Sequence, residues 1–280
     1  GQYNTLIGGL AGDALTDGDA NTALGYTAMS AVVTGDGNTA VGSRSMFTHT
    51  TGTMNTGLGR DALYSNTVGS YNTAVGEGSL YTNVNGSTSV AMGRLALYTQ
   101  NPATAVNMYN TGVGYGAGQS VTTGIRNTLV GGLAGDALTD ADYNVAVGTL
   151  ALSADTLGST AIAIGYGALQ TQNFTTAANN YNVAIGHSAG NATTTGVQNT
   201  IIGGLAGDAL TDADYNVAVG AQALGDNVLG SGSVAVGWIA LTSQNPATAV
   251  TMYNTAVGHQ AGGSITTGVQ NTIVGALAGD

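Results

Sequence analysis

Three acidic segments are the first candidates for chemistry in this 280-residue chain. Each reads Gly-Asp-Ala-Leu-Thr-Asp-x-Asp, and their carboxylates are Asp13, Asp17 and Asp19, then Asp136, Asp140 and Asp142, then Asp208, Asp212 and Asp214. Three carboxylates within a short turn could bind Ca²⁺, which takes about six to eight oxygen ligands. The pattern is neither an EF-hand loop nor the glycine-rich nonapeptide of calcium-binding β-rolls. We therefore expect solvated turns whose Asp side chains accept backbone N–H groups, with no cofactor, and keep Ca²⁺ as the alternative.

A second candidate is a set of large polar and aromatic side chains that each follow a recurring glycine. Its members are Arg60, Arg94, Tyr115, Tyr166, His187, Trp238 and His259. Arg and aromatic side chains are enriched at binding hot spots, so this set could form a surface-contact column. Such varied side chains at one repeat position fit a tolerant, solvent-facing slot better, and this is the interpretation we favour.

Neither candidate indicates catalysis. No recurrent acid or nucleophile accompanies His187 or His259, so a catalytic triad is not supported. Paired carboxylates for glycoside hydrolysis could come from different repeats, but catalytic sites rarely recur along a repetitive chain. We predict that the protein is not an enzyme and has no catalytic residues.

A repeat that runs through the whole chain must position these side chains. The pentad Asn-Thr-Ala-Val-Gly is unbroken in three copies, opened by Asn38, Asn72 and Asn254. Looser copies recur throughout. Their closing glycines follow a 17-residue step, which lengthens to a 21-residue step only after Gly93, Gly165 and Gly237. Four coils thus make a 72-residue super-repeat. A repeat of this length predicts stacked coils rather than a globular domain.

The residue pattern within one coil predicts a short strand and two corners. We number coil positions from the pentad Asn, which is position 0. Position 1 is always Thr, Val or Ile, position 3 is always large and apolar, and position 2 is mostly Ala. This alternation predicts a strand with positions 1 and 3 on one face, and the exchange of Thr for Val or Ile indicates that this face is buried. Glycine at position 4, and often at position 14, predicts two corners that exclude a Cβ.

Asn at position 0 predicts a ladder of hydrogen bonds between coils stacked in register. The ladder and corner residues of the clearest copies are Asn38, Gly42, Asn72, Gly76, Asn144, Gly148, Asn216, Gly220, Asn254 and Gly258. The three coils that lack this Asn begin at Ser89, Ala161 and Ser233, and these are the three 21-residue coils. The fold prediction is an all-β parallel β-solenoid (β-roll) of about sixteen coils. We expect residues 1–280 to be one repetitive region and a fragment of a longer fibre.

The charge balance bears on partners. The chain has no lysine, four arginines and a formal net charge of −11. Such a surface repels nucleic-acid phosphates and anionic lipids, so we expect neither nucleic acid nor membrane insertion. Cysteine is absent, so disulfides and thiolate metal sites are excluded.

The extended pattern Asn-Thr-Ala-Val-Gly-x-x-Ala-Leu, with a Gly-Ser or Gly-x turn before the next Asn, resembles a known repeat family. It resembles the head repeats of YadA-like trimeric autotransporter adhesins, and is still more similar to the same repeat in phage tail-fibre proteins. The resemblance rests on stretches such as 72–80 and 144–152 and covers the whole chain. It implies a parallel β-roll in which three chains associate side by side as a homotrimer.

The resemblance also implies a role. The expected function is structural: the shaft of a bacteriophage tail fibre or virion appendage that supports host attachment, located in the virion. A host-cell receptor would be bound by a region outside these residues. The alternative is a trimeric adhesin or extracellular filament at the bacterial cell surface. A third hypothesis, of another class, is an ice-binding solenoid that uses the Thr array at position 1, which would have to be flat and exposed.

Overall fold

The computed structural model describes residues 1–31 and 33–280, and every regular element in them is a β-strand. The backbone forms two compact units, Gly1–Asp142 and Tyr143–Asp280. Each is a stack of coils whose strands pair in parallel and in register, so the predicted all-β parallel β-solenoid is confirmed. The sixteen strands of the main ladders, eight in each unit, fall at the sixteen predicted pentads.

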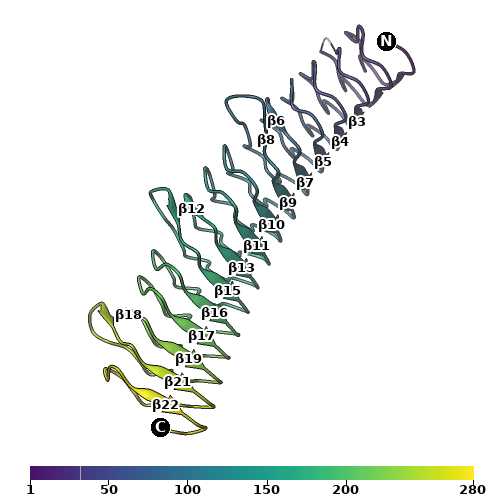
Figure 1. The fold of residues 1–280 in the computed structure, drawn as a ribbon. Helices are drawn as coiled ribbons and strands as arrows, with labels where there is room; N and C mark the ends of the chain where they lie inside the picture. Colours follow the sequence, from purple (N-terminus) through teal and green to yellow (C-terminus); the bar gives the residue numbers. More distant parts are fainter. Residues whose placement is uncertain (32) are drawn as a thin grey trace. The chain divides into compact units, whose positions relative to one another are not determined.

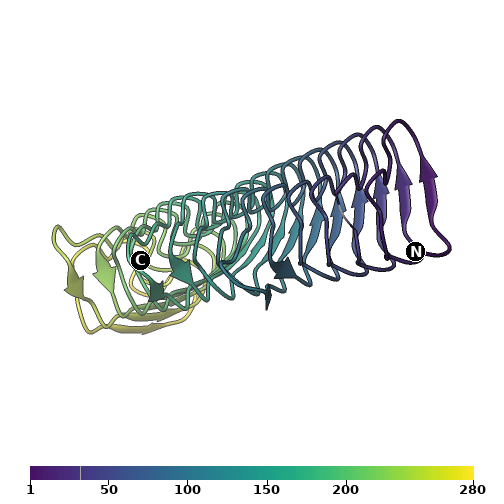
Figure 2. The same ribbon diagram turned by 90° about the horizontal axis from the view of Figure 1, so that it is seen from above.

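The first unit places one three-residue strand of each coil in its main ladder (Figures 1 and 2). These strands are β1 (Thr5–Ile7), β2 (Thr22–Leu24), β3 (Thr39–Val41), β4 (Thr56–Leu58), β5 (Thr73–Val75), β7 (Val90–Met92), β9 (Thr111–Val113) and β10 (Thr128–Val130). A second pair, β6 (Gly86–Ser87) and β8 (Val106–Asn107), lies across the coil from this ladder (Figure 1). β8 belongs to a 21-residue coil, and its pairing with β6 adds a second bridge to the preceding coil.

The second unit repeats this plan. Its main ladder consists of β11 (Val145–Val147), β13 (Ile162–Ile164), β15 (Val183–Ile185), β16 (Thr200–Ile202), β17 (Val217–Val219), β19 (Val234–Val236), β21 (Thr255–Val257) and β22 (Thr272–Val274). Two further pairs again mark the 21-residue coils: β12 (Gly158–Ser159) with β14 (Ala178–Asn179), and β18 (Gly230–Ser231) with β20 (Val250–Thr251).

The strand face that points inward corrects one prediction. Position 2 of the strand points inward, where Ala40 and Ala74 are fully buried. Positions 1 and 3 point outward and range from half-buried to exposed, so the predicted burial of the Thr and Val face is wrong for the single chain. The inward side chains share the interior with those of position 8: a Cβ added to Gly57, at position 2, would lie 2.7 Å from the Ser45 hydroxyl oxygen and 3.3 Å from Met46 Cε. Where position 2 carries the larger, fully buried Leu129 or Ile201, position 8 of that coil is glycine. Positions 1 and 3 of the main-ladder strands are called the outward sheet face below.

The two glycine corners have different physical causes. Gly148, at position 4, has φ +133°, and an added Cβ would lie 2.5 Å from the carbonyl oxygen of Gly165 in the next coil. Gly35, at position 14, has no positive φ, but a Cβ there would collide with the carbonyl oxygen of Gly52. The first corner requires both left-handed backbone and close approach, and the second requires close approach alone.

Candidate functional site

The Asn ladder lies inside the coils and joins each coil to its neighbour. Asn38 is fully buried, and its Oδ1 accepts the backbone N–H of Asn55 at 2.9 Å. Its Nδ2 donates to the carbonyl oxygen of Gly52 at 3.0 Å, which fixes the position 14 corner of the same coil. Direct amide-to-amide bonds also occur, as between Asn55 and Asn38 at 3.1 Å. The same bond to the position 14 carbonyl is made by Asn72, Asn144, Asn216 and Asn254, and the corners Gly42, Gly76, Gly148, Gly220 and Gly258 all have positive φ.

A buried Gln completes this ladder in the 21-residue coils, which sequence reasoning missed. Gln100 Oε1 accepts hydrogen bonds from Ser89 Oγ at 3.2 Å and from Asn110 Nδ2 at 3.0 Å. Gln244 bonds Ser233 and Asn254 in the same way, and Gln172 Oε1 accepts from Asn182 Nδ2 at 2.9 Å. The sequence does contain a sign of this role: each coil that lacks Asn at position 0 carries Gln at position 11.

The acidic segments act as hydrogen-bond acceptors in turns. Asp142 Oδ1 accepts the Ile125 N–H at 2.7 Å, and Asp214 Oδ1 accepts the Val197 N–H at 2.8 Å. Asp140 and Asp212 accept the Thr123 and Thr195 hydroxyls, each at 2.5 Å. Burial raises the pKa of Asp136 and of Asp208. Within residues 1–31 and 33–280, no three His, Asp or Glu side chains are grouped to hold a metal, and Ca²⁺ binding stays a prediction.

Three neighbouring pairs of the proposed surface-contact column, all at position 5, are in ring-to-ring or cation–π contact. The Tyr166 and His187 rings stack with centroids 5.4 Å apart, and those of Trp238 and His259 lie 4.7 Å apart at 39°. The Arg94 guanidinium lies over the Tyr115 ring, 5.7 Å from its centroid. Each pair joins a 21-residue coil to the coil after it, and small residues such as Gly204 and Ala221 separate the pairs of the second unit. In the second unit the column therefore consists of two separate exposed pairs, whereas in the first unit position 5 of four consecutive coils carries one connected run of Arg60, Glu77, Arg94 and Tyr115.

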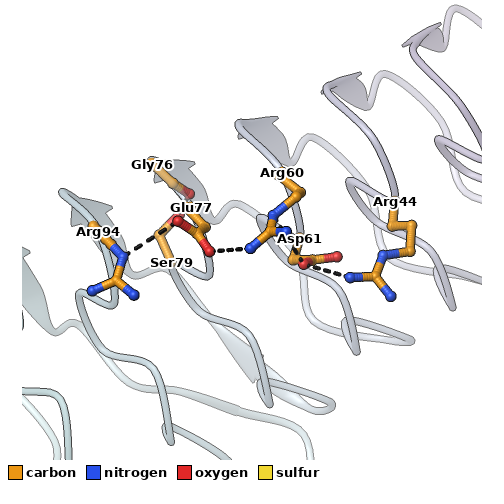
Figure 3. A network of polar contacts seen from close by, with 7 residues as sticks. All are labelled: Arg44, Arg60, Asp61, Gly76, Glu77, Ser79 and Arg94. Atoms are coloured by element: carbon orange, nitrogen blue, oxygen red, sulfur yellow. Dashed lines mark hydrogen bonds and ion pairs between the residues drawn. The ribbon is translucent and has the colours of Figure 1, made fainter.

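Charged side chains form a connected network on the first unit (Figure 3). Arg44 Nη2 bonds Asp61 Oδ2 at 2.8 Å, and Arg60 Nε lies 3.7 Å from the same oxygen. Glu77 then bridges Arg60 and Arg94, with Arg94 Nε 3.3 Å from Glu77 Oε2. The hydrogen bond from Arg60 lowers the pKa of Glu77, with a further contribution from Arg94. We call Arg44, Arg60, Asp61, Glu77 and Arg94 the arginine network; exposed ion pairs of this kind contribute little stability.

An aromatic ladder runs beside this network, and sequence reasoning missed it. Phe47, Tyr64, Tyr81 and Tyr98 all occupy position 9 of consecutive coils. Their ring centroids are 5.1, 4.8 and 5.0 Å apart, with interplanar angles of 14°, 7° and 13°. The Arg44 guanidinium lies 5.5 Å from the Tyr64 centroid. Burial raises the pKa of Tyr81, and the flanking Tyr64 and Tyr98 raise it further. The signal was four aromatic residues spaced by the coil length.

Two buried ionisable groups lie at position 11, inside the coils. The His49 ring nitrogens face the carbonyl oxygens of Asn66 at 3.1 Å and Gly52 at 2.9 Å. Burial lowers the pKa of His49. Asp155 accepts hydrogen bonds from Gln172 Nε2 at 2.6 Å and from the backbone of Gly158 at 3.0 Å, and burial raises the pKa of its carboxyl. Both groups are enclosed by coil backbone, so their evident role is structural.

Comparison with protein-family models and with curated proteins finds no match to this chain. The described part of the chain has no helix of the length and apolarity that a membrane span requires. The arrangement offers paired charges, stacked rings and an apolar outward face, all of which suit binding and self-association.

Proposed function

We propose that this chain is a β-solenoid segment of the shaft of a bacteriophage tail fibre or virion appendage, assembled as a homotrimer and supporting attachment to a host cell. The observation that carries the proposal is the outward sheet face. Leu24, Leu58 and Met92, at position 3 of alternate coils in the first unit, are 42%, 47% and 44% exposed. Val41 and Val75 lie between them and are partly exposed. A contiguous apolar surface of this kind marks an interaction site.

A second copy of the chain is the partner that fits this face best. The coils repeat the same outward residues at the same height in both chains, so two copies can align coil by coil. Tyrosines at the residue before the pentad border the face, and Tyr71 and Tyr109 are 63% and 51% exposed. Aromatic residues are enriched at protein interfaces, and burial of aromatic and aliphatic surface is the main favourable contribution to most protein association.

The interior supports the shaft role. Within each unit, neighbouring coils are tied together by strand pairing and by the buried Asn ladder, which gives resistance to bending without any binding site. Receptor contact is assigned to a part of the fibre outside these residues, and the virion is the expected location. A surface adhesin would share this architecture, and immunogold labelling of virions and of bacterial cells separates the two.

The test is the mass of the native particle by multi-angle light scattering. We expect three times the chain mass of 27.4 kDa. The double variant Leu24→Asp/Leu58→Asp places carboxylates on the outward sheet face and should shift the particle toward monomers. Thr51→Asp adds a carboxylate at an exposed position outside that face and serves as the matched control. A wild-type monomer at micromolar concentration would remove the homotrimer from the proposal.

One observation favours a second function, ice binding. Thr5, Thr22, Thr39, Thr56 and Thr73 are partners in successive parallel pairs and point outward. The burial that argued against this hypothesis is absent in the single chain, although the neighbouring position 3 is apolar throughout. Thermal hysteresis decides the question: a gap between the melting and freezing points would support ice binding, and the fibre proposal predicts none.

A further inference from the structure

The aromatic ladder presents ring edges, rather than ring faces, to solvent. Phe47, Tyr64, Tyr81 and Tyr98 are each half-buried, and the stacking covers both faces of Tyr64 and Tyr81. The exposed atoms of these two rings are therefore edge atoms. The edge of an aromatic ring is the positive part of its quadrupole and the face is the negative part.

We propose that this ladder is a binding site for a flat, extended aromatic anion that lies along the four rings. A planar ligand placed over the ladder offers its electron-rich face to the ring edges, which is the favoured edge-to-face geometry. Because the four rings are nearly parallel and evenly spaced, one ligand of several linked rings can make the same contact with each of them. A compact ligand of one ring could contact two at most.

The charges beside the ladder select an anion. The Arg44 guanidinium lies 5.5 Å from the Tyr64 ring centroid, and its side chain is 44% exposed. The arginine network holds three guanidiniums and two carboxylates, so it carries one excess positive charge on a protein whose formal net charge is −11. Asp61, the nearest carboxylate to Arg44, is paired with that guanidinium at 2.8 Å.

The site is confined to four coils. At position 9 the other coils carry Asp, Ser, Gln, Asn, Gly or Thr, and the second unit has no aromatic residue there. The same solenoid therefore contains an internal comparison, because coils with an almost identical backbone lack the rings. A ligand that recognised only the coil backbone would bind the coils without rings as well as the four coils that carry them.

Titration of the full chain with Congo red, a planar dye that bears two sulfonates, tests the proposal. We expect saturable binding that Tyr81→Ala weakens about tenfold, because it removes an inner ring and divides the ladder. Tyr81→Phe keeps the ring edge and should bind within twofold of wild type. Tyr26→Ala, which removes an exposed ring outside both the ladder and the outward sheet face in the same unit, is the matched control and should leave the affinity unchanged.

Two further measurements keep the proposal open to refutation. If circular dichroism shows that Tyr81→Ala does not fold, Tyr98→Gln is the alternative variant. It removes the last ring of the ladder and introduces the residue found at the same position of the next coil, Gln119. Arg44→Gln should weaken Congo red and leave the cationic planar dye thioflavin T unaffected. A Congo red affinity that loss of the ladder rings leaves unchanged, or that Tyr26→Ala lowers equally, would overturn the site. Thioflavin T binding as tightly as Congo red would overturn the assignment of an anion.

Discussion

Replacement of Gly148 by Val should separate two adjacent coils of the second unit. Gly148 has φ +133°, and the new Cβ would lie 2.5 Å from the carbonyl oxygen and 2.6 Å from the carbonyl carbon of Gly165. Neither atom belongs to a flexible side chain, so one coil has to move away from the other. That movement weakens the hydrogen bond from Gly165 N to Val147 O, now 2.8 Å, and that from Gly167 N to Thr149 O, now 3.0 Å.

The expected cost is a large fraction of the stability of a domain. An unfavourable φ costs about 1–3 kcal/mol, and each weakened hydrogen bond costs about 0.5–1.5 kcal/mol. We therefore expect Gly148→Val to lower the free energy of unfolding by about 3–5 kcal/mol. Gly148→Ala should reach most of this value, since the Cβ is the cause and the extra methyl groups of Val only add to it.

Urea denaturation followed by far-UV circular dichroism measures the effect. Thr149→Val, at the exposed residue next in the chain, is the control and should change the free energy of unfolding by less than about 0.5 kcal/mol. If Gly148→Ala unfolds at the wild-type urea concentration, the explanation of the position 4 corner by close backbone approach is wrong.

Three further predictions concern the buried polar interior. Asn216→Ala should cost about 2 kcal/mol in urea denaturation, because it leaves the Ser233 N–H without its bond at 2.9 Å and removes one of the two hydrogen bonds to the Gly230 carbonyl oxygen. An equally stable variant would show that the ladder contributes nothing. Because burial lowers the folded-state pKa of His49, the unfolded chain binds the proton first, so the free energy of unfolding should fall as the pH drops below about 6.5. His49→Asn, which copies Asn66 of the next coil, should flatten the dependence of the melting temperature on pH. A dependence that stays steep would assign the effect to another group. Burial raises the folded-state pKa of Asp155, so its stabilising contribution is present below the ordinary Asp pKa and is lost as the pH rises through the folded-state pKa. Asp155→Asn introduces the residue found at the equivalent positions Asn83 and Asn227. It should raise the urea midpoint at pH 7 and remove the gain in stability on acidification, and a lower midpoint would contradict this account.

Most of the fold could be predicted because the signals are local and repeated. A β-branched residue, a large apolar residue two places later and then Gly recur at every pentad, and this pattern has only one regular interpretation, a short strand that ends at a corner. The ladder residues Asn38 and Asn216 could be named for the same reason, because an Asn at a fixed place in stacked coils meets its counterpart.

The candidate site was less predictable, because its members come from different coils. Arg60 and Arg94 were recognised at position 5, but the arginine network also uses Arg44 and Asp61 from position 6. Gln100 was missed because its partners, Ser89 and Asn110, are distant in the sequence, and no local pattern links them. His187 and Trp238 were identified as surface residues, whereas their stacking with Tyr166 and His259 depends on how the 21-residue coils meet the coils that follow.

The sequence by itself determined the coil length, the parallel strand, the glycine corners and the position of the Asn ladder, since each depends on the period and on residue types within one coil. The tertiary structure decided which strand face points inward. Alternation separates two faces without orienting them, and the direction in which the chain closes into a coil turns position 2 inward, where Ala40 and Leu129 alike are fully buried. It also decided that Phe47, Tyr64, Tyr81 and Tyr98 form a ladder, because side chains one full coil apart in the sequence touch only when successive coils stack in register.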